Sequence, residues 1–372
     1  MNNQMAFLDH IDLEDFKASV ERTTRAEEYP GAVRIDRNIP IYDGDTVDDS
    51  LIPEWTRLFE TGPGVLVIKR AIRDLDAIDA ASAVFQQIIE DEKAAGIAAS
   101  DHFAKAGAND RIWNSHQKLC LRAPEVFLRY MTNPVIDTLY RSWLGPGYQM
   151  AAQVNQVRPS GKSQSPHRDY HLGFMTDAQL RQYPEPVHRH SHLFLMQGGV
   201  AHIDVPVDAG PTKLLPFSQV YPQGYAAAAL PEFRDYFEQN YVQLPLEKGD
   251  CVFFSPALFH AAGENRTSDV VRMVNLLQAS SPMVRAMESL DRAAMSRAVF
   301  PYLKGMDEEM LRLAIAATAE GYPFPTNLDS DPAIGGLAPE SQQGLLLRAV
   351  REDWSAAQLD QELDAQLERR KA

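Results

Sequence analysis

The segment Ser165-Pro166-His167-Arg168-Asp169 places an imidazole and a carboxylate two positions apart. On a strand, side chains at i and i+2 project from the same face, so His167 and Asp169 can converge on one point. Two ligands leave a metal ion underbound, and His260, which follows the turn and strand at 249–254, can supply a third. Two histidines and one carboxylate form the facial triad of non-haem Fe(II) oxygenases, which leaves positions open for a chelating co-substrate and O2.

A cation completes the pattern. Arg272 lies within the apolar segment 270–276, which we expect to form a largely buried strand. A buried guanidinium needs an anionic partner, and its planar fork suits a carboxylate. A keto diacid that chelates the metal at one end and meets Arg272 at the other satisfies both requirements. We therefore predict Fe(II) and 2-oxoglutarate as cofactors.

Residues 50–280 resemble the phytanoyl-CoA dioxygenase family, most specifically at 165–174, 208–219 and 249–278. The resemblance implies a double-stranded β-helix, and hydroxylation of a small molecule with release of succinate and CO2. It also implies that His167, Asp169 and His260 bind iron, and that Arg272 binds the distal carboxylate of 2-oxoglutarate. Two departures concern Ala262, where the family often has a serine that helps to hold the co-substrate, and residues 216–219, which read Pro-Phe-Ser-Gln instead of Pro-Gly-Ser-His.

The resemblance also predicts the type of reaction and further contacts to the co-substrate. Related halogenases carry a small residue in place of Asp169, so its presence predicts hydroxylation or desaturation rather than halogenation. By the same analogy, Gln156 and Thr212 are expected to contact the co-substrate.

Polar and aromatic residues elsewhere are candidate substrate contacts. The connector 109–118 is unusually rich in both, and Lys and Arg there would suit an anionic substrate. The candidates are Arg111, Trp113, Lys118, Arg158 and His171. His188, His190 and His192 alternate and could bind a metal on a strand, although Pro184 and Pro186 favour a loop that enters a strand. His202 and Asp204 repeat the His-x-Asp pattern, but the family comparison places them away from the iron.

The elements around these residues predict a mainly β protein with flanking helices. Apolar spacing indicates helices at 73–95 and 123–143. Short β-branched and aromatic segments separated by turns follow: 150–158, 192–196, 200–205, 213–216, 241–245, 250–254 and 270–278. This pattern of short strands and turns is typical of a jelly-roll, cupin-like core, and we expect the N-terminal helices to pack on one sheet.

We divide the chain into an N-terminal arm (1–45), an oxygenase domain (46–282) and a C-terminal helical extension (283–372). In the expected last helix (345–367), Trp354, Leu359, Leu363 and Leu367 share roughly one face. That face is expected to pack on the core, with a homodimer contact as the alternative.

The amino-acid composition limits the possible binding partners of the protein. The 372-residue chain is 45% apolar and has a net charge of −15, which disfavours nucleic acid and anionic membranes as partners. Two cysteines exclude a disulfide framework, and no signal peptide or membrane span is evident, so we expect a cytoplasmic protein. The partners expected are O2 and a small-molecule substrate whose identity, including any CoA, the sequence leaves open.

The leading hypothesis is an Fe(II)- and 2-oxoglutarate-dependent hydroxylase. Two alternatives stay open at this point. One keeps the cofactors but leads to desaturation, epimerisation or cyclisation, because the outcome depends on which C–H bond faces the metal. The other is a non-catalytic jelly-roll protein that binds a small molecule or a metal ion.

Overall fold

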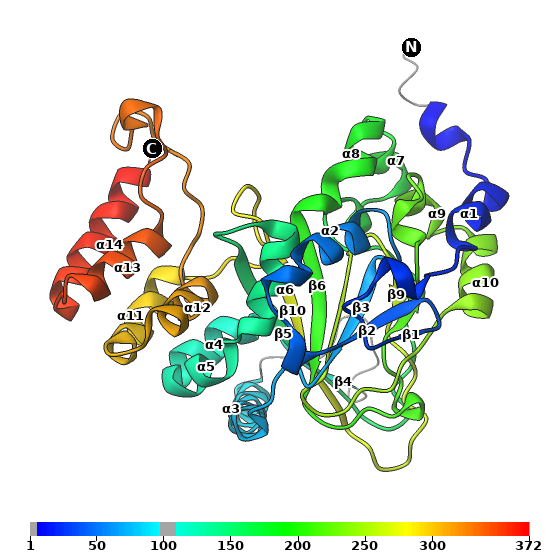
Figure 1. The fold of residues 1–372 in the computed structure, drawn as a ribbon, viewed down its shortest axis with the longest axis horizontal. Coiled ribbons are helices and arrows are strands. Elements are labelled where there is room, and N and C mark those ends of the chain that lie inside the picture. Colours follow the sequence, from blue (N-terminus) through cyan, green and yellow to red (C-terminus); the bar gives the residue numbers. More distant parts are fainter. Residues whose placement is uncertain (1–5, 97–108, 372) are drawn as a thin grey trace.

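The computed structural model describes residues 6–96 and 109–371, and its centre is an eight-stranded mixed sheet (Figure 1). The strand order is β1-β2-β3-β8-β6-β10-β5-β4, and a two-stranded sheet pairs β7 with β9. The strands are β1 (Arg34–Asp36), β2 (Ile39–Asp43), β3 (Val65–Lys69), β4 (Asn109–Ile112), β5 (Gln149–Val157), β6 (Leu195–Ala201), β7 (Lys213–Leu215), β8 (Cys251–Phe254), β9 (Phe259–Ala261) and β10 (Arg272–Ser280).

Helices take up more of the described chain than strands do. They are α1 (Leu13–Val20), α2 (Ile52–Glu60), α3 (Leu75–Ala94), α4 (Ser115–Arg122), α5 (Pro124–Met131), α6 (Pro134–Leu144), α7 (Asp177–Leu180), α8 (Glu185–His190), α9 (Gly224–Ala227), α10 (Pro231–Asn240), α11 (Arg292–Leu303), α12 (Glu308–Thr318), α13 (Gln342–Arg351) and α14 (Ala356–Arg370). The expected combination of a sheet core with flanking helices is confirmed, but helices exceed strands, and the segments 177–190 and 224–240 add short helices that were not expected. None of the helices in the described ranges has the length and apolar character needed to cross a membrane.

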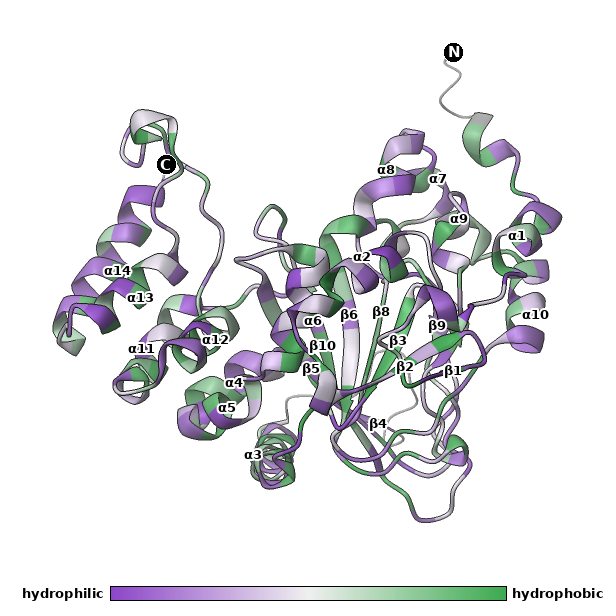
Figure 2. Cartoon of the chain, in the orientation of Figure 1, coloured by the Kyte–Doolittle hydropathy of each residue, from purple (hydrophilic) through white to green (hydrophobic). Residues whose placement is uncertain are grey.

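The two faces of the large sheet have different neighbours. The outer face packs against helices α2 to α6 and forms the main hydrophobic core, which includes Val154, Val200 and Met273. The inner face carries Val252 and Phe254, which pack with Leu214 and Leu258 around the small sheet. Figure 2 shows apolar residues concentrated on the strands in the middle of the molecule. Side chains on the inner face are therefore enclosed between two sheets, where a site can be shielded from water.

At one side of the molecule α11 and α12 pack on α4 and α5, and α13 and α14 pack in turn on α11 and α12 (Figure 1). The expected last helix is two helices that are separated near Trp354. Leu359 and Leu363 of α14 are buried, and α14 packs against α11 and α13 rather than against the sheets. Leu367 is 39% exposed. A homodimer contact through these helices stays a prediction.

Two other expectations about elements are wrong in their boundaries. The predicted helix at 123–143 is split into α5 and α6, because Pro134 disfavours helical backbone at Asn133, which instead caps α6 by accepting a hydrogen bond from the Ile136 amide. The predicted strand at 192–196 begins only at Leu195, after a helical turn.

His202 is a buried histidine between the outer face and the helices. Its Nε2 lies 2.7 Å from the Tyr130 hydroxyl and its Nδ1 lies 2.8 Å from Ser82 Oγ. Ser82 Oγ donates to the Ile78 carbonyl, so Ser82 accepts from Nδ1–H and Tyr130 donates to Nε2. This chain of hydrogen bonds requires a neutral ring, and burial lowers the pKa of His202 to about 3. Both ring nitrogens of His202 therefore have protein partners within the described chain.

The His202→Gln variant should lose less stability in acid than the native protein. Between the unfolded pKa of about 6.5 and the folded pKa, only the unfolded chain binds a proton at this position, so the native protein loses stability as the pH falls. One such histidine contributes about 2 kcal/mol between pH 6.5 and pH 5. Urea unfolding at both pH values measures the difference, and identical losses in the two proteins would contradict the assignment.

Candidate metal centre

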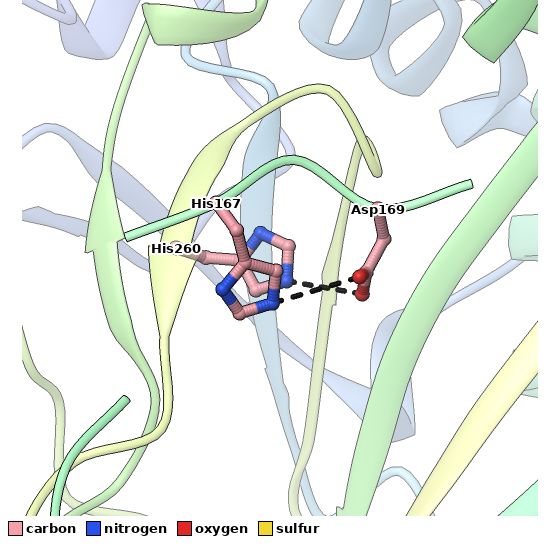
Figure 3. Close-up of side chains that lie close together, drawn as sticks. All are labelled: His167, Asp169 and His260. Carbon is pink, nitrogen blue, oxygen red and sulfur yellow. Dashed lines mark hydrogen bonds and ion pairs between the residues drawn. The ribbon is translucent and has the colours of Figure 1, made fainter. Parts of the chain in front are cut away.

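His167, Asp169 and His260 meet on the inner side of the large sheet. One potential ligand atom from each lies within 4.8 Å of the others, and no other group of three or more His, Cys, Asp or Glu residues in the described chain could hold a metal ion. Figure 3 shows both imidazoles turned toward the Asp169 carboxylate. His167 Nε2 is 3.5 Å from Asp169 Oδ1, and His260 Nε2 is 3.2 Å from Oδ2.

Backbone pairing holds the two ligand-bearing segments together. His167 and His260 form an isolated antiparallel bridge in which each amide donates to the carbonyl of the other, at 3.0 and 3.2 Å. The Asp169 amide donates to the Pro256 carbonyl at 2.9 Å. The third ligand therefore reaches the first two because 167–169 pairs alongside β9, not because the segments are close in the chain.

Arg168, between the two ligands, anchors this segment from behind. Its side chain is 2% exposed, and Nη2 donates to the Ser218 and Tyr221 carbonyls at 2.5 and 2.8 Å. The guanidinium also lies against the Tyr225 ring, 5.1 Å from its centroid. Because Arg168 points away from the ligands, the alternation of a strand puts its neighbours on the metal side.

The imidazoles are oriented for metal binding. Nδ1 of His167 lies 3.0 Å from the Ser165 carbonyl, and Nδ1 of His260 lies 2.8 Å from the Leu258 carbonyl. A carbonyl can only accept, so each Nδ1 carries a proton, and Nε2 is the nitrogen of each ring that can bind a metal ion. This arrangement is the usual support of a metal-bound histidine.

The charges of the three side chains suit a cation. Burial disfavours a charged Asp169, but the hydrogen bond and charge of His260 and the nearby His167 outweigh it, so the pKa of Asp169 is well below its usual range. Burial, followed by the neighbouring His260, lowers the pKa of His167. At neutral pH, Asp169 is thus a carboxylate and His167 a neutral imidazole, which are the forms that bind a metal ion.

Gln197 of β6 is a neighbour of the triad that the sequence analysis missed. Its Nε2 donates to Asp169 Oδ2 at 2.6 Å and lies 3.2 Å from His260 Nε2. The available signal was a lone glutamine in the apolar stretch Leu-Met-Gln-Gly-Gly-Val-Ala. Gln197 is therefore placed to orient the carboxylate ligand.

Arg272 and its surroundings fit a dicarboxylate. Its side chain is 5% exposed, and Nη1 donates to the Ala209 and Gly263 carbonyls at 3.0 and 3.2 Å. Within the described chain, no carboxylate lies within 4.0 Å of it. Burial lowers its pKa to about 10, which still leaves it charged at neutral pH.

Gln156 and Arg158 lie on the wrong face for the roles predicted for them. Gln156 pairs with Met273 and lies 3.4 Å from Gln86 of α3, on the helix-covered outer face. Arg158 forms an ion pair with Asp110, the residue that Lys93 of α3 also contacts. The two side chains share a face, but that face does not bear the triad, so the structure contradicts the site roles predicted for Gln156 and Arg158. Gln153 and Asn155 occupy the inner face instead.

The remaining candidates vary in position. Arg111 is buried, donates to Gln153 Oε1 at 3.0 Å and packs on Trp113, and its charge contributes to the lowered pKa of His167. Lys118 forms an ion pair with Glu92 of α3. His171 is exposed, and Thr212 is partly buried directly before β7. Arg111 and Trp113 therefore stay candidate substrate contacts, whereas Lys118 has a structural partner.

The histidines at 188, 190 and 192 do not share a strand face. His188 and His190 end α8, and His192 lies in the following helical turn. His188 and His192 are buried, and Nε2 of His188 lies 3.1 Å from the Leu180 carbonyl. Helical geometry separates alternate positions, so this segment forms no metal site.

With this geometry established, comparison with known proteins decides the family. The model of the phytanoyl-CoA dioxygenase (PhyH) family matches residues 62–274, which is more than half of the chain. The chain belongs to this family. The match contains all three residues of the triad and Arg272, and with the metal-binding geometry it confirms Fe(II) and 2-oxoglutarate as the cofactors of this oxygenase.

Two curated relatives are dioxygenases from fungi. Dioxygenase cdmD of Talaromyces verruculosus is 31% identical over 139 residues, which cover 37% of this chain and 41% of the relative. Dioxygenase trt7 of Aspergillus terreus is 25% identical over 148 residues, 40% of this chain and 46% of the relative. The alignments thus span less than half of each relative.

Solved structures show more distant likenesses. The non-haem α-ketoglutarate-dependent carbocyclase SnoK from nogalamycin biosynthesis is 17% identical with a TM-score of 0.46, over 64% of this chain and 86% of its own. The epimerase SnoN, in complex with Fe3+, α-ketoglutarate and nogalamycin RO, is 18% identical with a TM-score of 0.42, over 63% and 85%.

Proposed function

We propose that this oxygenase hydroxylates a C–H bond of a small molecule, using O2 and 2-oxoglutarate and releasing succinate and CO2. The observation that carries the proposal is the triad of His167, Asp169 and His260 on the same enclosed face as a buried arginine without a carboxylate partner in the described residues. We further propose that the large sheet and the facing β7–β9 pair form a double-stranded β-helix core, as the family implies.

The protein supplies the ligands, their orientation and the exclusion of water. When bound, Fe(II) and 2-oxoglutarate would supply the electrons that activate O2, which is the oxidant. His167, Asp169 and His260 would hold the metal on one side and leave the other side open. Arg272 would receive the distal carboxylate of 2-oxoglutarate, and Gln197 would keep the Asp169 carboxylate in position. The His167 side chain is 35% exposed, so substrate can approach from that side.

Hydroxylation is preferred over the other outcomes because Asp169 occupies a coordination position and the family implies this chemistry. Desaturation, epimerisation or cyclisation with the same cofactors stays an alternative. The choice between them depends on where the substrate lies relative to the metal, which the protein controls through the walls of the site.

The test is turnover of the purified protein with Fe(II), O2 and 2-oxoglutarate. We expect O2-dependent succinate formation, and with a converted metabolite from a mass-shift screen we expect a gain of one oxygen atom that carries label from 18O2. A product that has lost two hydrogens would indicate desaturation or cyclisation, and a product with the mass of the substrate would indicate epimerisation, instead of hydroxylation. Failure to form succinate under any of these conditions would contradict an oxygenase function.

A further inference from the structure

The segment that joins the sheets to the C-terminal helices, residues 281–291, lies against the triad side of the large sheet. Gln153 and Gln149 of β5 point to the inner face, as their register with β10 and β6 shows. Gln153 Nε2 lies 3.7 Å from Met287 Sδ, and Gln149 Nε2 lies 3.5 Å from the Val284 carbonyl. The family match ends at residue 274, so this wall of the site belongs to a part of the chain outside the shared family region.

Glu288 on this segment has one carboxylate oxygen in use and one without a partner. Oε1 accepts a hydrogen bond from the Asn114 amide at 2.7 Å. Oε2 is buried and has no hydrogen-bond partner within the described residues. A buried carboxylate oxygen that lacks a donor destabilises the protein, so its persistence requires an explanation.

The charges around Glu288 connect it to the metal centre. The charge of Glu288 acts on Tyr170, the residue directly after Asp169. The charge of Arg111 acts both on Glu288 and on His167. Burial raises the pKa of Glu288, while the Asn114 amide and the charges of Lys118 and Arg111 oppose this change. Glu288 therefore lies in the neighbourhood of Tyr170 and Arg111, on a segment that contacts the inner face of the sheet through Gln153.

We propose that Glu288 is a substrate-binding residue whose Oε2 accepts a hydrogen bond from a hydroxyl or protonated amine of the molecule that is oxidised. The proposal rests on the oxygenase function above and adds a substrate class to it, a small molecule with a hydrogen-bond donor. Such a donor satisfies the unpartnered oxygen, and it fixes the distance between that group and the C–H bond at the metal. A purely structural role would need only Oε1, which the Glu288→Gln variant retains.

The test uses three fragments of similar size: benzylamine, benzyl alcohol and benzyl methyl ether, which has no donor. Binding to the full chain loaded anaerobically with Fe(II) and 2-oxoglutarate is followed by saturation-transfer NMR and by the visible charge-transfer band of the metal chelate. Fragments of this size bind in roughly the millimolar range. The variants are Glu288→Gln and Glu288→Leu. The control is Asp291→Asn, which removes the same charge from the same segment and preserves the cap that Asp291 provides to α11.

We expect the amine or the alcohol to bind at least about tenfold more tightly than the ether, as a hydrogen bond to a charged group predicts. This preference should disappear in Glu288→Leu. In Glu288→Gln the preference for the amine over the ether should weaken about tenfold. Asp291→Asn should bind all three fragments as the native protein does. Equal binding of all three fragments, no binding of any, or unchanged binding in Glu288→Leu would overturn the proposal. A missing charge-transfer band in the native protein would instead refute the oxygenase function, since NMR detects fragment binding independently.

Discussion

The Asp169→Ala variant should bind Fe(II) more than about 100-fold more weakly than the native protein and form no detectable succinate. Loss of a hydrogen-bond partner of a metal ligand already costs about 10- to 100-fold in metal affinity, and this change removes the ligand itself. It also removes the only carboxylate of the triad. Metal content after dialysis and succinate formation from 2-oxoglutarate measure the effect.

Asp204→Ala is the matched control for this change. Asp204 also follows a histidine by two residues, but it is exposed and accepts a hydrogen bond from the Lys248 amide at 2.9 Å. It should retain native iron content and turnover. Equal iron loss in both variants would show that the metal is not held where the triad places it.

The Arg272→Met variant should raise the KM for 2-oxoglutarate by about 30-fold or more while retaining iron. Removal of one partner of a buried, hydrogen-bonded charge pair costs about 2–5 kcal/mol, and each 1.4 kcal/mol is a factor of about ten. Methionine fills a similar volume without the charge. Arg272→Lys should have an intermediate effect, because it restores the charge but not the planar fork. Initial rates of succinate formation across 2-oxoglutarate concentrations give the KM.

The Arg292→Met variant is the control for Arg272→Met, because it removes a buried arginine that lies elsewhere in the chain. Arg292 is 7% exposed, donates to the Thr318 and Met150 carbonyls and also has a pKa lowered to about 10 by burial. We expect this variant to be less stable but to have a native KM for 2-oxoglutarate. If Arg292→Met and Arg272→Met raised the KM equally, the assignment of Arg272 to the co-substrate would be wrong.

The metal ligands could be predicted from the sequence because their signal is chemical. A histidine and an aspartate two positions apart, with a later histidine and a strand-borne arginine, define a site whatever the exact strand boundaries are. The structure adds the reason that the distant ligand arrives: the backbone bridge between His167 and His260.

The orientation of β5 could not be predicted in the same way. Nearly all of its residues are buried, because helices cover one face and the small sheet encloses the other. Alternation of polar and apolar residues identifies a face only when the other face meets water. The sequence therefore holds no signal that distinguishes Gln156 from Gln153 and Asn155, and none that singles out Gln197.

Helical content was underestimated for a different reason. Short helices such as α7 and α8 have few residues over which a helical period can appear, and the segments around them contain many turn-forming residues.

The contacts of the segment 281–291 with Gln153 and Asn114 could not be predicted either, because they join residues that are far apart in the chain.

The central claim is that one ferrous ion and one keto diacid assemble on His167, Asp169, His260 and Arg272. Anaerobic titration of the purified protein with Fe(II) and then 2-oxoglutarate, followed by visible absorption, tests it most directly. We expect a charge-transfer band that saturates at one Fe(II) per chain, requires both components and is lost in His260→Ala. A native protein that binds Fe(II) but shows no band with 2-oxoglutarate, or a His260→Ala variant with a full band, would contradict it.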